Sequence, residues 1–189
     1  REEEEKKAEL LKMRGDIAKE GMNLMRAGHT VEAVKRYQKY ILILEFWKKT
    51  GRNGLTIDFF DRSKDLYEIV LISGVYWDMA KLYDRAKRTD QREELNRSLQ
   101  KYVAFSKGMP FQALASEALR RYLGSGKCVH RVEFKKSYVT LTGETCFIAT
   151  SLLDVTDHET ITHLRLFRDR HLKRFFIGRA FIRSYYRYS

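Results

Sequence analysis

The most constraining feature of the sequence is the near absence of residues that interrupt a helix: it has one proline and eleven glycines among 189 residues. Between these few breaks the apolar residues recur at helical spacing, as at Leu66, Ile69, Val70 and Val75. A composition of 43% hydrophobic residues, with 13% aromatic residues, excludes a disordered chain. The sequence therefore predicts an all-α fold of one domain or two small ones.

Residues 15–45 predict two antiparallel helices joined by a turn at 27–30. Small residues at Gly21 and Ala33 would let the two helices approach closely, and Thr30 is expected to cap the second helix. This arrangement resembles a tetratricopeptide repeat. The resemblance implies an α-solenoid fragment, in which stacked helical hairpins form a concave surface that binds other proteins. The residues that carry it are Gly21, Leu24, Ala27, Gly28, Ala33, Tyr37 and Tyr40.

Three further helices are predicted after a loop at 48–54. The first is capped by Ser63 and runs to about Lys87, the second starts at Thr89 or Asp90 and ends before Gly108, and the third starts at Pro110. We expect the first two to form a second, degenerate repeat. The residues that indicate it are Ala80, Tyr83, Ser98, Tyr102, Phe105 and Pro110.

The glycines at 124 and 126 suggest a boundary after a repeat region of residues 1–123. Residues 124–144 are expected to form a linker and a short helix at about 130–141, which ends at Gly143. Residues 145–189 are expected to form a separate C-terminal region with helices at 156–176 and 179–188.

Four short motifs follow one another in this C-terminal region: Cys146–Thr150, Leu164–Asp169, Gly178–Phe181 and Tyr185–Tyr186. Their order and spacing resemble the CFI box at the C-terminus of many bacterial proteins. The Tyr-Gly segment that usually follows the first motif is replaced here. The resemblance implies a helical CFI-box subdomain over 146–189 and a bacterial origin, and it implies no established chemistry.

The net charge of +12 is concentrated near the C-terminus, where residues 160–189 carry eight Lys and Arg against the single Asp169. Such a surplus indicates an acidic protein surface, nucleic acid or anionic lipid as partner, or else a solvated basic face. In the last predicted helix, three arginines recur every four residues and three aromatic residues lie on another face. The cationic residues proposed to bind in this region are Arg165, Arg168, Arg179, Arg183 and Arg187.

Two cysteines are too few for a disulfide framework, and we interpret them as reduced thiols of a cytoplasmic protein. Cys146 could be a nucleophile if His158 or His163 lay within hydrogen-bond reach, although its apolar neighbours favour a buried, inert thiol. Cys128, His130, Cys146 and His158 are ligand types that zinc prefers, but their spacing is too loose for a zinc signature.

These patterns together favour a non-enzymatic bacterial scaffold or adaptor without a cofactor. Its expected partner is a protein or a larger assembly, with an anionic surface as an alternative and nucleic acid less favoured. A thiol- or metal-dependent enzyme centred on Cys146 is the alternative from another class. No transmembrane segment is expected, and association with a membrane or a large complex is left open. The expected partner contacts of the repeat region are Asn23, Arg26, Lys35, Gln38 and Lys39.

Overall fold

The computed structural model describes residues 2–86 and 90–143, and this part of the chain contains helices and no strand. It confirms the predicted all-α class. The α-helices are α1 (Glu2–Arg26), α2 (Thr30–Trp47), α3 (Leu66–Asp84), α4 (Asp90–Ser106), α5 (Gln112–Gly124) and α6 (Arg131–Thr142), and a short 3-10 helix, η1, spans Ile57–Phe59.

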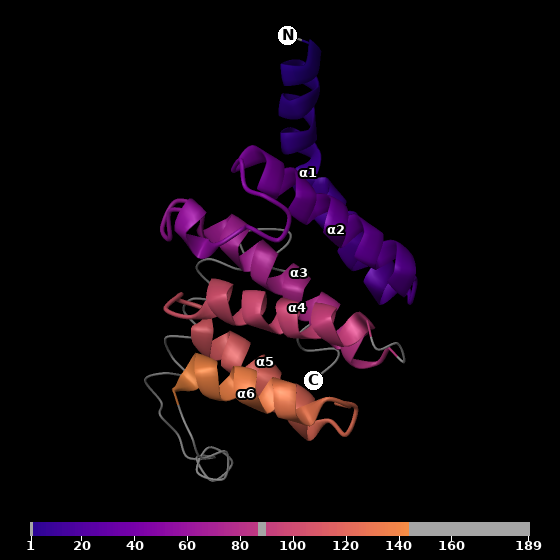
Figure 1. The fold of residues 1–189 in the computed structure, drawn as a ribbon, viewed down its shortest axis with the longest axis vertical. Coiled ribbons are helices and arrows are strands. Elements are labelled where there is room, and N and C mark those ends of the chain that lie inside the picture. The colour runs from indigo at the N-terminus through magenta and orange to yellow at the C-terminus, as the bar shows by residue number, and fades with distance from the viewer. Residues whose placement is uncertain (1, 87–89, 144–189) are drawn as a thin grey trace.

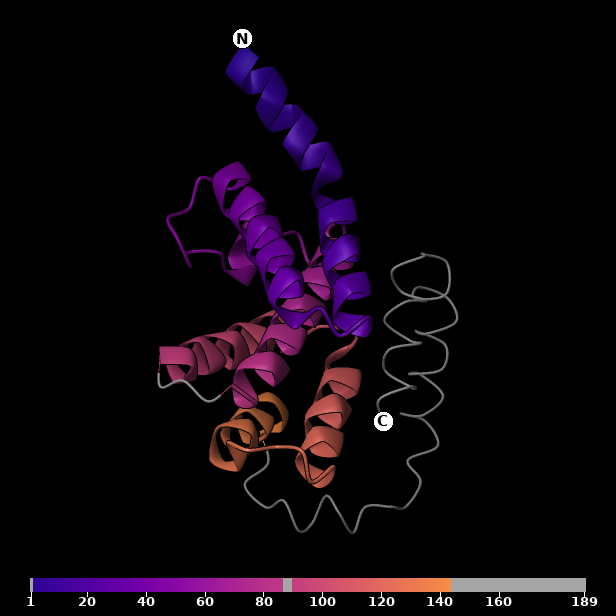
Figure 2. The same cartoon turned by 90° about the vertical axis from the view of Figure 1, so that its right-hand side faces the viewer.

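The helices pack as three consecutive pairs, α1 with α2, α3 with α4, and α5 with α6, which succeed one another from top to bottom in Figure 1. The first turns of α1 extend beyond the other helices, as Figure 2 shows from the side. One cluster of buried side chains runs through all three pairs, from Ile17 in α1 to Leu141 in α6. None of the described helices is long and apolar enough to cross a membrane.

The first pair is held close by a small residue on each helix. A Cβ atom on Gly21 of α1 would lie 2.7 Å from Cε1 of Tyr37 in α2. Ala33 is fully buried on the same helix as Tyr37. The close approach predicted from these two small residues is therefore confirmed.

Helix α3 is apolar on nearly every face, as expected of a helix surrounded by others. Acidic residues on α3 join it to the first pair. Glu68 accepts a hydrogen bond of 2.6 Å from the hydroxyl of Tyr40 and pairs with Arg14 at 2.8 Å. Asp78 accepts a hydrogen bond of 2.8 Å from the Tyr37 hydroxyl. Buried polar groups of this kind fix the orientation of one hairpin on the next.

Aromatic side chains fill the space between the second and third pairs. The ring of Trp77 in α3 stacks on Tyr102 of α4, with centroids 5.0 Å apart, and meets the edges of Tyr122 and Phe134. The Tyr102 hydroxyl also donates to the carbonyl oxygen of Ala115 at 2.9 Å. These contacts tie α5 and α6 to the same core as the earlier helices.

Three predicted helix starts are wrong, each by one or two residues. Thr30 is the first residue of α2 rather than its cap, because Gly28 in the left-handed region (φ 85°) turns the chain and leaves His29 at the N-cap. Before α3, the carboxylate of Asp61, not Ser63, accepts the nearby backbone N–H groups, and the helix begins at Leu66. Pro110 lies in a turn ahead of α5, whose N-cap is Phe111.

The other boundaries also lie near their predicted positions. Helix α3 ends at Asp84 instead of about Lys87, and α4 starts at Asp90, one of the two predicted starts. Helix α6 confirms the short helix predicted at about 130–141, and Gly143 ends it with φ 75°. Of the two glycines predicted to mark a boundary, Gly124 is the last residue of α5 and Gly126, with φ 70°, lies in the connection to α6, which packs on α5.

Candidate functional site

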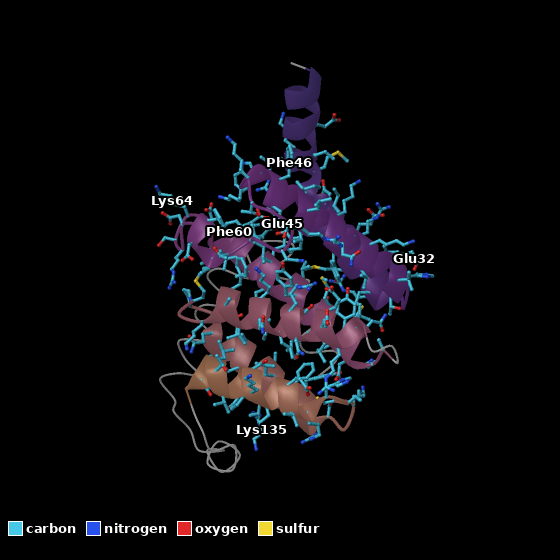
Figure 3. The ribbon with its side chains drawn as sticks, in the orientation of Figure 1. Glu32, Glu45, Phe46, Phe60, Lys64 and Lys135 are labelled. Atoms are coloured by element: carbon cyan, nitrogen blue, oxygen red, sulfur yellow. The ribbon has the colours of Figure 1, made fainter. Side chains whose placement is uncertain are left out.

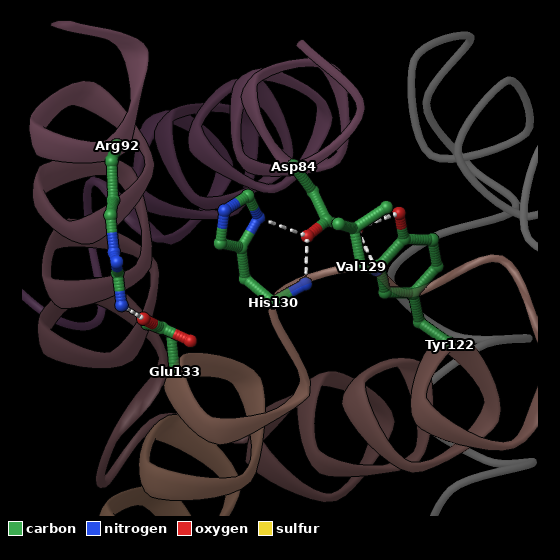
Figure 4. Close-up of polar contacts among 6 residues, drawn as sticks. All are labelled: Asp84, Arg92, Tyr122, Val129, His130 and Glu133. Carbon is green, nitrogen blue, oxygen red and sulfur yellow. Dashed lines mark hydrogen bonds and ion pairs between the residues drawn. The ribbon is translucent and has the colours of Figure 1, made fainter. Parts of the chain in front are cut away.

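A buried carboxylate at the end of α3 gathers the polar groups that connect the second and third helix pairs (Figure 4). Asp84 is fully buried. Its Oδ2 accepts hydrogen bonds from the Tyr122 hydroxyl at 2.7 Å and from the backbone N–H of Val129 at 3.0 Å. Its Oδ1 accepts the backbone N–H of His130 at 2.7 Å and lies 3.0 Å from Nδ1 of the same residue.

Burial of Asp84 by itself raises the pKa of its carboxyl group. The backbone N–H groups of His130 and Val129, together with the side chains of Tyr122 and His130, outweigh burial and lower that pKa below its ordinary value. Burial first, and then the hydrogen bond to the charged Asp84, raise the pKa of the Tyr122 hydroxyl. The cluster thus holds an ionised carboxylate whose lone pairs are occupied by donors.

Cys128 lies next to this cluster, so that a cysteine, a histidine and an aspartate occur together. Cys128 is 8% exposed. Burial first, and then the negative charge of Asp84, raise the pKa of the Cys128 thiol to about 12. A nucleophilic cysteine requires the opposite shift, so this group of residues favours a structural contact over thiol catalysis.

Only some of the predicted metal ligands lie among the residues that the structure describes. Of the four, Cys128 and His130 are described, and His130 contacts Asp84. The described part of the chain contains no group of three or more His, Cys, Asp or Glu residues that could hold a metal ion. Cys146 and His158 lie outside the described residues, as does His163 of the predicted nucleophile set.

A second buried acid lies in the interior next to the loop that follows α2. Glu45 is 4% exposed, and its Oε1 has no hydrogen-bond partner within the described structure. Burial raises the pKa of Glu45, and the backbone of Asn53, Lys101 and Arg52 partly offset this effect. Lys101 donates instead to the carbonyl oxygens of Asn53 at 2.8 Å and Leu55 at 2.6 Å, which fastens the loop to α4.

The predicted partner contacts of the repeat region are all exposed on the first helix pair. Arg26 donates to Oδ1 of Asn23 at 3.0 Å, and Gln38 approaches the Tyr83 hydroxyl at 3.5 Å. The remaining two residues of this set, Lys35 and Lys39, are exposed on α2. The predicted C-terminal contacts Arg165, Arg168, Arg179, Arg183 and Arg187 lie outside the described residues.

Sequence reasoning missed Asp84, Tyr122 and Glu45 as interior polar residues. Each of the two acids stands near the end of an apolar helix, where a charged residue is usually exposed. The donors to Asp84 lie 38 to 46 residues further along the chain. Helical spacing contains no signal for contacts over that separation.

No protein-family model matches the chain, and comparisons with curated proteins and with solved structures give no significant match.

Proposed function

We propose that this chain is a non-enzymatic scaffold or adaptor, built from tetratricopeptide-like helical hairpins, that binds a protein partner. The observation that carries the proposal is that the first pair exposes polar and cationic side chains: Lys35, Gln38 and Lys39 of α2 and Asn23 and Arg26 of α1. Stacked helical hairpins bind their partners through extended surfaces.

The packing of the first two pairs supports the proposed repeat type. In the first pair, a Cβ atom on Gly21 would meet the ring of Tyr37. In the second pair, Ala80 of α3 and Ser98 and Phe105 of α4 are almost fully buried. Small residues at helix contacts with large aromatic residues around them are typical of tetratricopeptide hairpins.

The proposal assigns the C-terminal region, residues 145–189, a supporting role. Because residues 146–189 resemble the CFI box, we infer that the chain is a bacterial protein. Its two cysteines are compatible with the reducing cytoplasm. The basic and aromatic residues of this region would cap the helical stack or form a second docking element, because Tyr and Arg are enriched in protein interfaces.

Affinity capture from a lysate of the source organism tests the proposal. The full-length chain serves as bait beside two variants, Lys35→Glu with Lys39→Glu, and Arg179, Arg183 and Arg187 each →Gln. We expect a specific protein to be retained by the parent and lost from at least one variant. A matched double reversal at the exposed Lys12 and Lys64 controls for the change in net charge.

Two results would reject the scaffold. One is the absence of any protein that the parent retains above an unrelated bait of equal charge. The other is capture that nuclease treatment abolishes and that falls steeply between low and moderate salt, since this is the behaviour of a nucleic-acid binder.

A further inference from the structure

One face of α2 carries apolar and cationic residues together where a helix of a globular protein normally carries polar residues alone. Val31, Lys35, Lys39, Leu42 and Phe46 recur at intervals of three and four residues, so they form one line along the helix. We refer to these five residues as the α2 stripe. Its apolar members are strongly exposed: Val31 is 64%, Leu42 59% and Phe46 56% exposed. Glu32 and Phe46, labelled in Figure 3, mark the two ends of α2.

The lysines of the α2 stripe are not neutralised within the described part of the chain. Arg36, one residue from Lys35, pairs with Glu20 of α1 at 3.0 Å, whereas no described ion pair includes Lys35 or Lys39. Among the described residues, the stripe therefore offers two cationic groups without an ion-pair partner, placed between apolar side chains.

The pattern of the stripe points to the chemistry of its partner. An acidic group would pair with Lys35 and Lys39, while an apolar side chain would cover Leu42 and its neighbours. Helix α2 has 18 residues, a length of about 27 Å. A second amphipathic helix meets these conditions when its apolar residues lie between acidic ones on a single face.

A flat anionic membrane fits the same surface less well. Glu32 of α2 is exposed beside the stripe, whereas Glu20 of α1, on the same side, is paired with Arg36. A bilayer would meet the Glu32 carboxylate, because it cannot follow a single line of side chains. A helix, which is narrow, can contact the stripe without it.

We propose that the α2 stripe binds an acidic amphipathic helix of a protein partner. This inference rests on the proposed scaffold function and names the chemical class of its partner. It also assigns Leu42 the central apolar contact, with Lys35 and Lys39 selecting for acidic residues on the bound helix.

A defined peptide tests the inference on the full-length chain. The probe is a fluorescent, hydrocarbon-stapled helix of about 20 residues with leucine and glutamate alternating along one face. The control peptide carries lysine in place of every glutamate. We expect saturable binding of the acidic peptide by anisotropy, weakened by added salt, and at least about tenfold weaker binding of the lysine peptide.

Variants assign the binding to the α2 stripe. Leu42→Gln should weaken the acidic peptide at least about fivefold, and Lys35→Glu with Lys39→Glu at least about tenfold. The Lys12→Glu with Lys64→Glu protein, which has the same net charge as the double reversal in the stripe, should stay within about twofold of the parent. Circular dichroism of each variant verifies that the fold is retained.

Several outcomes would overturn the inference: no saturable binding, equal binding of both peptides, or equal binding by the parent and the stripe variants. Binding to phosphatidylglycerol vesicles that is lost with the stripe variants, without peptide binding, would assign the surface to membranes. A concentration-dependent dimer that Leu42→Gln dissolves would assign it to a second copy of the chain. Failure here together with successful partner capture would leave the scaffold function standing and remove the α2 stripe as its site.

Discussion

Asp84 at the end of α3 and His130 at the start of α6 are joined twice, through the backbone N–H of His130 at 2.7 Å and through its Nδ1 at 3.0 Å. The carboxylate also accepts from Tyr122 of α5. One buried residue of the second helix pair thereby fixes both helices of the third pair. Loss of a buried, hydrogen-bonded charge is costly because its donors are left without an acceptor.

Asp84→Asn is expected to lower the free energy of unfolding by about 2–4 kcal/mol. The amide group of asparagine would place a donor against the Tyr122 and Val129 donors, so at least one hydrogen bond is lost. Chemical denaturation at pH 7 measures the effect. The control is Glu133→Gln, which removes the ion pair with the largely exposed Arg92 and should cost less than about 1 kcal/mol. Equal losses in the two variants would show that Asp84 is no more than a surface contact.

The pH dependence of the Asp84 effect has a definite sign. The folded protein lowers the pKa of this carboxyl, so the stability it contributes is present above the pKa of the unfolded chain, about 3.9. This contribution is lost as the pH falls through the lower, folded pKa. The stability gap between the parent and Asp84→Asn should therefore narrow below about pH 4. A constant gap over that range would contradict the assignment.

Gly21 and Gly15 both lie on α1 but differ in the space around them, so their alanine variants can be compared directly. A Cβ atom at Gly21 would lie 2.7 Å from Cε1 of Tyr37, whose hydroxyl is held by Asp78, whereas a Cβ atom at Gly15 would meet no atom within 4 Å. Gly21→Ala should destabilise the protein by about 1–3 kcal/mol through overpacking. Gly15→Ala should stabilise it by about 0.5–1 kcal/mol, because alanine loses less entropy in a helix. Thermal melts of both variants that shift in the same direction would refute the close packing of the first pair.

Cys128 should react slowly with iodoacetamide in the folded protein. A thiol pKa of about 12 leaves on the order of one thiolate in ten thousand at pH 8, and the thiolate is the reactive form. Labelling is followed by mass spectrometry in a Cys146→Ala background, so that only Cys128 is read. Unfolding in urea should restore the rate of an ordinary cysteine. Rapid labelling of the folded chain would instead identify Cys128 as an activated thiol.

The predictable part of this fold is the part encoded by local spacing. The first hairpin is predictable from Gly21, Ala33 and Tyr37. Small and large residues at helical intervals indicate which faces of the two helices pack against each other. The predicted starts at Thr30 and Ser63 are misplaced because turns set by Gly28 and Asp61 decide where α2 and α3 begin. The predicted start at Pro110 is misplaced because Pro110 lies in the turn ahead of α5.

The buried polar groups were not predictable in the same way. The sequence offers His130 as a possible metal ligand, yet the structure pairs it with Asp84, 46 residues earlier in the chain. The spacing of apolar residues in α2 predicts that the charged residues of this helix, including Glu45, are exposed. Only the packing of α2, the following loop and α4 reveals that it is buried.

Glu45 leads to the last prediction, which concerns the sign of its contribution to stability. The side chain is buried with Oε1 unpartnered, and burial raises its pKa despite the opposing effects of the Asn53 backbone, Lys101 and Arg52. A group whose pKa is raised on folding binds a proton more readily in the folded state than in the unfolded chain. The ionised Glu45 side chain at neutral pH therefore lowers the free energy of unfolding. Stability should rise as the pH falls through the folded pKa towards the ordinary glutamate value of 4.5.

Glu45→Gln removes this charge and should stabilise the protein at pH 7, by about 1 kcal/mol. The advantage should shrink as the pH approaches 4.5, where the parent carboxyl also becomes neutral. Glu32→Gln on the same helix is the control, because Glu32 is exposed in the first turn and should change stability by only a few tenths of a kcal/mol. Urea denaturation of the three proteins between pH 4.5 and pH 8 measures both effects. A Glu45→Gln variant that is less stable than the parent at pH 7 would mean that the carboxylate is held by Lys101 as a stabilising buried pair.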